Sequence, residues 1–393
     1  MINRDKCTGC SACMNICPYS AITMEEDIGG FKYPKIDKEK CRHCGLCDKV
    51  CELTNCRPKT VPIRALGIKN KNEQIRATST SGGAFYSMAN YFLEQGGVVY
   101  GAAFDECWNV KHIRCSNAEQ LKKLQRSKYV QSDLGSTFQD VESELKKGKK
   151  VLFSGTACQC SGLLSLLDVR KINRENLFTC DLVCHGVPSP QIWKEYVQFR
   201  ERKCAIRNID FRNKQKGWRD FRILLEYENG KRKTFRQNED YFLVLFFHNY
   251  ILRTCCHSCL YSQVERLTDF TLGDFWGIEN VDPNFSDDKG ISVIFANSKK
   301  GDSIIDAISN NYTMISTAID SVVQGQPNLR RPTPQNSRAN EFWNDYQNKR
   351  DFKYLIQKYA DATVIGIIKR KYIFKALHYT GIFRLLLKLK NRE

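Results

Sequence analysis

The chain has 393 residues, of which 42% are apolar and 26% charged, so its composition is that of an ordinary globular protein with room for more than one domain. The formal net charge is +18, but the basic residues are spread along the chain, so no nucleic-acid partner is expected. No apolar run approaches the roughly 20 residues that a transmembrane helix needs.

Cysteine is the unusual residue of this chain. There are 19 cysteines, and the sequence opens without a charged-then-apolar export segment. Because thiols stay reduced inside cells, metal ligands or buried apolar groups are expected here rather than disulfides. We therefore expect a cytoplasmic protein.

Residues 1–60 contain an internal repeat of cysteines. The spacing C-x2-C-x2-C-x3-C occurs first at Cys7, Cys10, Cys13 and Cys17, and again at Cys41, Cys44, Cys47 and Cys51. In two-cluster ferredoxins the first three cysteines of such a run bind one [4Fe–4S] cubane and the fourth binds the other. The pattern therefore predicts one cluster at Cys7, Cys10, Cys13 and Cys51, and a second at Cys17, Cys41, Cys44 and Cys47.

The rest of this region favours a ferredoxin-type module. A zinc site usually takes two C-x2-C pairs, so three cysteines at equal intervals argue against a zinc knuckle. Pro18 follows the first motif as the ferredoxin pattern expects, whereas Glu52 follows the second. Residues 21–24 and 31–36 are expected to be short strands, and 57–62 a linker. The predicted fold of residues 1–60 is an α+β, ferredoxin-like 2[4Fe–4S] module.

From residue 61 onward, strands alternate with helices. Strands are expected over 65–68, 98–104, 151–154, 177–184, 270–272 and 292–295, and helices over 82–94, 136–147, 158–167 and 190–203. The alternation predicts an α/β domain over 61–326 with a mixed, mostly parallel sheet. Residues 205–236 instead favour antiparallel hairpins, with a turn at Asn229-Gly230.

The last region, 327–393, is expected to be a helical, basic C-terminal extension. Between residues 364 and 390 aliphatic residues alternate with lysine and arginine. A helix with such an apolar stripe and flanking cations suits an anionic membrane surface, and it equally suits docking on the protein itself. Both interpretations, including peripheral membrane contact, stay open.

Four further cysteines occupy positions from which one metal centre could collect them. Cys158 follows the strand 151–154 and Cys184 closes the next strand, so a right-handed βαβ crossover brings both to the carboxyl edge of the sheet. Cys256 and Cys259 form a separate C-x2-C pair in a loop after an expected long helix. From spacing alone, a third cluster, a zinc site and inert buried thiols all remain open.

Six blocks of this sequence resemble one known family. They are TSGGAF (80–85), SKYVQS (127–132), GTACQ (155–159), DLVCHGVPSP (181–190), the Cys256-x2-Cys259 pair and DFTLGDFWG (269–277). In this order they are similar to the coenzyme F420 hydrogenase/dehydrogenase beta-subunit family, in its bacterial form with a fused N-terminal 2[4Fe–4S] ferredoxin module. The resemblance covers roughly residues 1–310.

The resemblance implies an iron–sulfur flavoprotein oxidoreductase. Its cofactors would be FAD and a third [4Fe–4S] cluster, with ligands Cys158, Cys184, Cys256 and Cys259. A low-potential redox protein such as ferredoxin would supply electrons, which would pass through the clusters to the flavin and then to or from a small-molecule substrate, F420-like or another. Cys160 and Cys255 adjoin implied ligands, so a ligand swap stays open. The alternative function is a non-catalytic electron-transfer subunit that docks on a separate enzyme.

The flavin site is expected where residues 79–83 open the helix over 82–94. Ser81, Gly82 and Gly83 are small enough to let backbone N–H groups approach a pyrophosphate, although an ordinary helix cap has the same composition. Lys128 is expected to pair with a flavin phosphate or the reduced ring, and His185 to relay protons or donate to a cluster sulfur. Both are candidate catalytic residues, with a purely structural role as the alternative.

Overall fold

Two short helices and a hairpin form the cysteine-rich N-terminal module. The computed structural model describes residues 3–362. After the 3-10 turn η1 (Arg4–Lys6) the module contains α1 (Ala12–Ile16), β1 (Ile22–Glu26), β2 (Lys32–Ile36) and α2 (Leu46–Lys49). The strands pair antiparallel, with Ile22 opposite Ile36, as expected for strands on either side of a Gly-Gly turn. The α+β, ferredoxin-type fold is confirmed.

A mixed eight-stranded sheet organises the larger part of the chain, in the order β13-β3-β12-β11-β7-β6-β4-β5. The strands are β3 (Arg64–Asn70), β4 (Val98–Phe104), β5 (Val110–Cys115), β6 (Val151–Ser154), β7 (Leu177–Leu182), β11 (Phe270–Asp274), β12 (Ser292–Ala296) and β13 (Tyr312–Thr317). The central pairs β4–β6, β6–β7 and β7–β11 are parallel, and the outer pairs are antiparallel. The pairing makes β3, β4, β6, β7 and β11 run in one direction, which confirms a mixed, mostly parallel sheet.

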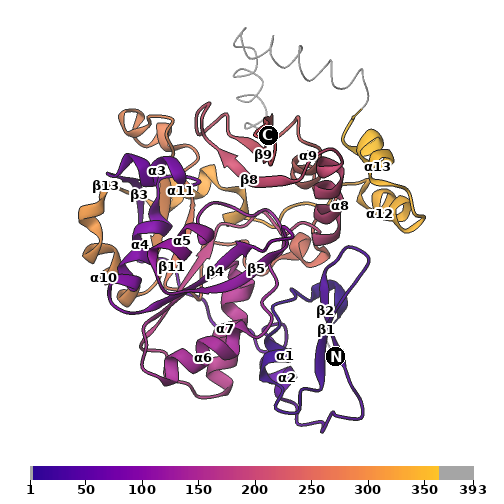
Figure 1. Ribbon diagram of the computed structural model, residues 1–393. Helices are drawn as coiled ribbons and strands as arrows, with labels where there is room; N and C mark the ends of the chain where they lie inside the picture. The colour runs from indigo at the N-terminus through magenta and orange to yellow at the C-terminus, as the bar shows by residue number, and fades with distance from the viewer. Residues whose placement is uncertain (1–2, 363–393) are drawn as a thin grey trace.

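Helices cover both faces of this sheet (Figure 1). One face packs against α4 (Ala84–Glu94), α5 (Ala118–Leu124) and α10 (Lys299–Ala307), and the other against α6 (Thr137–Lys146), α7 (Ala157–Val169) and α11 (Ile319–Gly325). Side chains alternate along each strand, so β4 sends Val99 to the first face and Val98 and Tyr100 to the second. The short helix α3 (Glu73–Thr78) follows β3, and the 3-10 turns η3 (Ile278–Asn280), η4 (Pro283–Phe285), η5 (Ser309–Asn311) and η6 (Pro327–Leu329) lie in connections.

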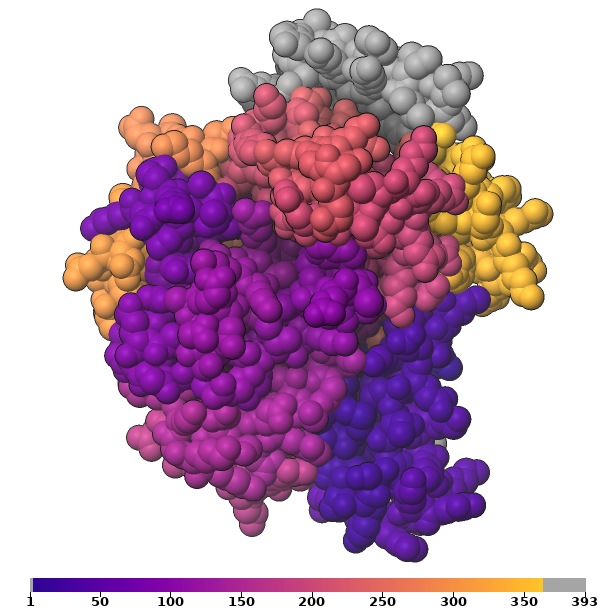
Figure 2. Space-filling model, viewed as in Figure 1, coloured from indigo at the N-terminus to yellow at the C-terminus, as the bar shows by residue number. Residues whose placement is uncertain are grey.

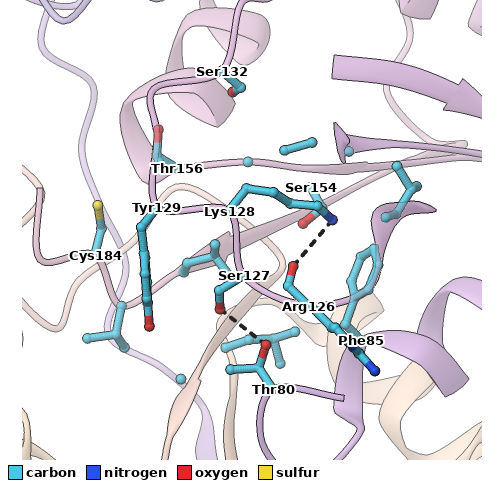
Figure 3. Close-up of a pocket in the computed structure, with 18 of the residues that line it drawn as sticks. Thr80, Phe85, Arg126, Ser127, Lys128, Tyr129, Ser132, Ser154, Thr156 and Cys184 are labelled. Carbon is cyan, nitrogen blue, oxygen red and sulfur yellow. Dashed lines mark hydrogen bonds between the residues drawn. The ribbon is translucent and has the colours of Figure 1, made fainter. Parts of the chain in front are cut away.

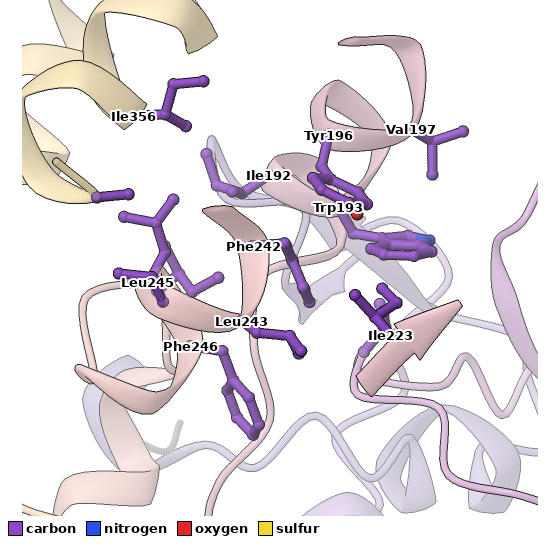
Figure 4. Packing of buried hydrophobic residues seen from close by; sticks show 14 of the residues in the cluster. Ile192, Trp193, Tyr196, Val197, Ile223, Phe242, Leu243, Leu245, Phe246 and Ile356 are labelled. Atoms are coloured by element: carbon purple, nitrogen blue, oxygen red, sulfur yellow. The ribbon is translucent and has the colours of Figure 1, made fainter. Parts of the chain in front are cut away.

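A separate antiparallel layer lies beside the sheet and has its own core. It consists of β8 (Ile206–Asn213), β9 (Arg222–Tyr227), β10 (Arg232–Arg236), α8 (Pro190–Glu201), α9 (Tyr241–Phe247), α12 (Ala339–Gln347) and α13 (Phe352–Tyr359). Figure 4 shows Trp193 and Tyr196 of α8 packed near Phe242 of α9. The expected hairpins over 205–236 are confirmed.

The helix before the Cys256 pair is shorter than expected. We predicted a long helix, but α9 has seven residues and ends at Phe247, with His248 as its C-cap. Asn249 follows with φ +62°, a left-handed conformation that stops an α-helix and that asparagine tolerates. The pair then begins in the 3-10 turn η2 (Thr254–Ser258).

The C-terminal extension is described only in part. Helices α12 and α13 belong to the antiparallel layer, whereas the expected basic helix over 364–390, with its predicted membrane contact, lies outside the described residues. Between residues 3 and 362, no helix is both long and apolar enough to cross a bilayer.

The N-terminal module packs against the second face of the larger part (Figures 1 and 2). Ala12 and Ile16 of α1 share a hydrophobic core with α6 and α7. The Arg57 guanidinium bonds Glu52 of the module at 2.6 Å and Asp168 of α7 at 2.9 Å. Lys32 of the module pairs with Asp133 at 2.6 Å. The module is therefore held by apolar packing and by charged hydrogen bonds together.

Candidate functional site

The cysteines of the first predicted cluster lie together where the module meets α7, and we call this group the inner site. It consists of Cys7, Cys10, Cys13 and Cys51. Burial raises the pKa of the Cys10 thiol to about 11, and the nearby thiols of Cys7 and Cys51 add to the rise. Burial also raises the pKa of Cys13, with Cys10, Cys7 and Cys51 contributing. These mutual effects require the thiols to be neighbours, so the structure brings the predicted set together.

The inner site lies directly against a glycine of α7. A β-carbon added at Gly162 would lie 2.9 Å from the Cys10 sulfur and 3.0 Å from its β-carbon. Because real β-carbons keep larger distances, only glycine fits at this point of the helix. The absence of a side chain at Gly162 lets the cysteine loop of the module approach the helix backbone.

The cysteines of the second predicted cluster line one cavity of about 160 Å³, and we call this group the outer site. All four members, Cys17, Cys41, Cys44 and Cys47, belong to the cavity lining. Cys44 and the adjacent Arg42 and His43 are exposed. The backbone N–H of Ala21 donates to the Cys17 sulfur at 3.4 Å. Four thiols around one cavity fit a cubane, and this site is open to solvent.

The remaining four candidate ligands meet at the carboxyl edge of the sheet, and we call them the third set. Its members are Cys158 at the start of α7, Cys184 after β7, Cys256 in η2 and Cys259 after it. Burial raises the pKa of Cys184 to about 12, and the Cys259 thiol adds to this. Burial also raises the pKa of Cys158, with Cys259, Cys255 and Cys184 contributing. The structure thus brings the third set together.

Hydrogen-bond donors surround the sulfurs of the third set. The Val187 N–H donates to Cys256 at 3.4 Å, the Tyr261 N–H donates to Cys259 at 3.4 Å, and the Thr156 hydroxyl lies 3.1 Å from Cys158. Such donors stabilise thiolate ligands. Within residues 3–362, no three His, Cys, Asp or Glu side chains are arranged to hold a single metal ion.

The two neighbouring cysteines differ in their surroundings. Cys160 belongs to the buried face of α7, and its thiol donates to the Cys180 carbonyl oxygen at 3.7 Å. Cys255 is also buried, but it is the thiol neighbour of Cys256 and it contributes to the raised pKa of Cys158. Both neighbours therefore lie within electrostatic range of Cys158, and Cys255 is the one whose thiol also bonds an implied ligand, Cys256.

A cavity of about 310 Å³ opens at the same edge of the sheet (Figure 3). Its walls come from the ends of β6, β7 and β11, from residues 79–86 and from residues 124–132. Cys184 and His185 are part of the lining, so the third set borders the cavity. Open α/β sheets bind their ligands at this edge, and the volume is at the lower limit of small-molecule sites.

The predicted flavin segment reaches the cavity only in part. Ser81 and Gly83 line it, whereas Gly82 packs between β3 and β12, where a β-carbon would collide with the Ile68 carbonyl and the Ser292 N–H. The Ser81 hydroxyl donates to the Ile291 carbonyl at 2.6 Å. Gly83 caps α4 with φ +88°, which other residues rarely adopt. Packing therefore explains Gly82, and backbone geometry contributes to the choice of glycine at 83.

Lys128 and His185 both line the cavity. The ammonium group of Lys128 donates to the carbonyl oxygens of Lys123 at 2.7 Å and Gln125 at 2.6 Å. Burial lowers the Lys128 pKa to about 7, and Arg126 contributes to the lowering. His185 Nε2 lies 2.8 Å from Asn249 Oδ1, and burial lowers its pKa. Lys128 is thus a cation whose charge changes near neutral pH.

Sequence reasoning missed a histidine in the cavity wall. His112 on β5 places Nε2 3.0 Å from the Ser154 carbonyl and Nδ1 3.0 Å from the Ser132 hydroxyl, which also accepts from Gln159 Nε2 at 2.9 Å. Burial lowers the His112 pKa to about 4, so it is neutral at pH 7. No sequence signal marked it, because β5 itself was not expected.

Asp274 was also missed, although it stands inside a quoted sequence block. It closes β11, lines the cavity, pairs with Arg212 at 3.1 Å and accepts from Trp218 Nε1 at 2.9 Å. Its place at the carboxyl end of a central strand was a signal that could have found it. The Arg212 side chain is buried beside it.

Comparison with known proteins agrees with this architecture. Residues 148–321 match the family that represents the C terminus of the coenzyme F420 hydrogenase/dehydrogenase beta subunit, and residues 6–55 match a 4Fe–4S dicluster domain. The coenzyme F420-dependent sulfite reductase of Methanocaldococcus jannaschii is 30% identical over 175 residues, which are 42% of this chain and 26% of that protein. This chain thus spans about a quarter of that relative's length.

Among solved structures, the fold is similar to a chain of the F420-reducing [NiFe] hydrogenase complex from Methanosarcina barkeri, studied by xenon derivatisation. The TM-score is 0.48 and the identity 19%, covering 74% of this chain and 92% of that chain. The two family matches confirm the resemblance seen in the sequence. The chain therefore combines an N-terminal 4Fe–4S dicluster domain with a region, residues 148–321, that matches the C terminus of the coenzyme F420 hydrogenase/dehydrogenase beta subunit.

Proposed function

We propose that this protein is an iron–sulfur flavoprotein oxidoreductase that passes electrons from a low-potential donor, through [4Fe–4S] clusters, to a flavin acting on a small-molecule substrate. One observation carries the proposal: the three cysteine sets are arranged in series toward the cavity. The outer site reaches solvent at Cys44, the inner site contacts α7 at Gly162, and the third set borders the cavity at Cys184.

Helix α7 supports the link between the inner site and the third set. Gly162 contacts Cys10, and Cys158 lies four residues earlier, about one turn or 6 Å along the helix and on the same face. Tyr261 is a second link. Burial raises its pKa, with contributions from Cys158 of the third set and Cys10 of the inner site. One buried side chain therefore lies within electrostatic range of both groups.

The third set has the donors that a cluster requires. We propose Cys158, Cys184, Cys256 and Cys259 as its ligands, because all four are thiols, three have nearby hydrogen-bond donors, and they come from two strand ends and one loop. Thiolate ligands and donors to their sulfurs are typical of [4Fe–4S] sites. The geometry also permits Cys255, in place of Cys256, as a ligand of this cluster.

The position of the cavity beside the third set and its lining support a flavin at this place. A bound flavin supplies the exchange between one-electron and two-electron chemistry. Ser81, Gly83 and Lys128 line the cavity, and Lys128 offers a proton or positive charge to an anionic group. Below pH about 7 Lys128 is charged, so binding of an anionic ligand should weaken as the pH rises through 7. His112, neutral and doubly hydrogen-bonded, holds the Ser132 hydroxyl in the cavity wall.

The relative from Methanocaldococcus jannaschii is named for its dependence on coenzyme F420, so F420 is the first compound to test. The electron donor is proposed to be a redox protein such as ferredoxin, because the outer site is exposed at Cys44.

Metal and flavin content of protein purified without oxygen tests the proposal. We expect about twelve irons, about twelve acid-labile sulfides and one flavin per chain. Cys184→Ser should lower the iron content by about four, whereas Cys180→Ser, at a buried cysteine of β7 outside the third set, should leave it unchanged. About eight irons and no flavin in the unaltered protein would contradict the proposal and favour a non-catalytic electron-transfer subunit.

A further inference from the structure

One arginine connects the inner site to the loop of the third set. The Arg253 side chain is completely buried, and its residue begins the 3-10 turn that carries Cys255 and Cys256. Its Nε donates to the Cys7 carbonyl at 2.8 Å, and its Nη2 donates to the Lys32 carbonyl at 2.9 Å. Both acceptors belong to the N-terminal module. Arg253 therefore joins two cysteine loops that are about 250 residues apart in sequence.

The rest of the guanidinium is equally enclosed. Nη1 donates to Gln131 Oε1 at 3.0 Å, and Gln131 in turn donates through Nε2 to the Thr8 carbonyl at 3.0 Å. The guanidinium lies 4.1 Å from the centre of the Tyr33 ring. A β-carbon at Gly9 would lie 2.9 Å from Nη1, so the first cysteine loop wraps closely around the cation.

Arg253 differs from the other buried arginines in its charge balance. Arg76 bonds Asp287 at 2.7 Å, Arg212 pairs with Asp274 at 3.1 Å, and Arg266 pairs with Asp181 at 3.2 Å. In the described part of the chain, Arg253 is the one fully buried arginine that forms no ion pair with a carboxylate. A buried charge without a counter-charge is strongly unfavourable, so a negative group should lie close to it.

We propose that Arg253 is a positioning residue that fixes the inner site against the third set and supplies the positive charge that balances the inner cluster. This inference rests on the proposed function at one point, the assignment of a cluster to the third set. The inner cluster does not depend on that assignment, because its cysteines belong to the dicluster domain. A cubane with four thiolate ligands carries net negative charge, which increases by one unit on reduction. A buried cation beside it therefore favours the reduced form and raises its reduction potential.

Among the described residues that line the outer site, no buried arginine or lysine is present. Arg42 and His43, next to its cysteines, are exposed to water, where charge effects are strongly screened. The two module clusters should therefore differ in potential, with the inner one easier to reduce. This order favours the passage of electrons from the solvent-exposed site inward.

The test is a redox titration followed by electron paramagnetic resonance on the full chain. Arg253→Gln removes the charge, and at a fixed potential the ratio of oxidised to reduced inner cluster should rise at least ten-fold, about 59 mV for one electron. Arg253→Lys, which keeps the charge, should restore most of this change. Cys44→Ser, which removes an outer-site ligand, and Cys184→Ser, which removes one of the third set, identify the signals of those two clusters.

Two further variants keep the test decisive if Arg253→Gln does not fold. Gln131→Glu leaves Arg253 in place but puts a carboxylate 3.0 Å from it, and should shift the inner potential in the same direction. Arg4→Gln is the matched control, because Arg4 lies 4.3 Å from the same Tyr33 ring but is exposed, and should cause no shift. The proposal would be overturned if Gln131→Glu, with full iron content, left the reduction potential of the inner cluster unchanged. The same result in Arg253→Gln, where that variant folds, would also overturn it.

Failure of the role of Arg253 can be distinguished from failure of the proposed function. Iron, sulfide and flavin are counted on the same samples. A chain with about eight irons and no flavin would refute the flavoprotein proposal, yet the potential of the inner cluster could still be compared between variants. A chain with about twelve irons and one flavin, but with no effect of either substitution, would refute only the role of Arg253.

Discussion

The two halves of the N-terminal module have identical cysteine spacing and different surroundings. Their backbones also correspond: the second residue after the first cysteine is left-handed in both, as Gly9 (φ +69°) and His43 (φ +51°). The residue after the second cysteine is left-handed too, as Ser11 (φ +58°) and Gly45 (φ +74°). The spacing thus reproduces one loop geometry twice.

The difference between the halves comes from docking. Gly9 lies against Arg253 and Lys32, and Gly162 lies against Cys10, so neither position has room for a side chain. At the corresponding place in the outer loop His43 is exposed, and nothing lies within 4 Å of a β-carbon added at Gly45. The motif determines which thiols can share a cluster, and the contact with the larger part determines how that cluster is shielded.

The largest expected effect on this comparison comes from Gly162→Leu. The new side chain would occupy the place of Cys10, so the inner cluster should be lost, with iron falling by about four per chain, while the outer cluster remains. Iron and sulfide analysis with paramagnetic resonance measures this. His43→Gly in the outer loop is the control and should retain all iron. Full iron content in Gly162→Leu would mean that the inner loop does not depend on this contact.

Removal of iron should separate the two sites by rate. With a chelator and a mild oxidant the outer cluster should leave first, about ten-fold faster or more, because Cys44 is exposed whereas Cys10 is partly buried and packs against the core under α7. Absorbance and paramagnetic resonance follow the two phases. Loss of both clusters at one rate would show that docking does not protect the inner site.

Matched alanine substitutions compare the two loops thermodynamically. Both Gly9→Ala and Gly45→Ala introduce a left-handed alanine, which costs about 1–2 kcal/mol. Gly9→Ala should cost about 1–2 kcal/mol more, because its β-carbon would lie 2.9 Å from Arg253 and 3.0 Å from the Lys32 carbonyl. Urea denaturation of the cluster-loaded protein measures the difference, and equal losses of stability would contradict the close contact at Gly9.

The smallest expected effect concerns ion pairs at the two ends of the module. Arg57→Ala removes hydrogen bonds to Glu52, Asp168 and the Ser161 carbonyl at a partly buried contact with α7, and should cost about 1–2 kcal/mol. Lys40→Ala breaks an exposed pair with Asp37 and should cost less than about 0.5 kcal/mol. The same denaturation experiment compares them, and an equal effect would mean that Arg57 does not hold the module in place.

The sequence by itself determined the features that depend on local spacing. The two cysteine runs predicted both ligand groups of the module, and the structure brings each group together, because the fourth cysteine of each run returns to the other loop. Strand β4 has the predicted bounds Val98–Phe104, and β6 has the predicted bounds Val151–Ser154, because buried strands show as short continuous apolar runs. The βαβ unit placed Cys158 and Cys184 at one edge of the sheet.

Only the tertiary structure decided which residues pack against the cysteine loops and which strands complete the sheet. Strands β5 and β13 at the sheet edges were not expected, since their alternation is weak and pairing with a neighbour stabilises them. Gly162 and Arg253 looked like ordinary residues, because the groups that they contact lie about 150 and 250 residues away in sequence. Docking of the module onto α7 gives both residues their significance, and local spacing carries no information about such long-range contacts.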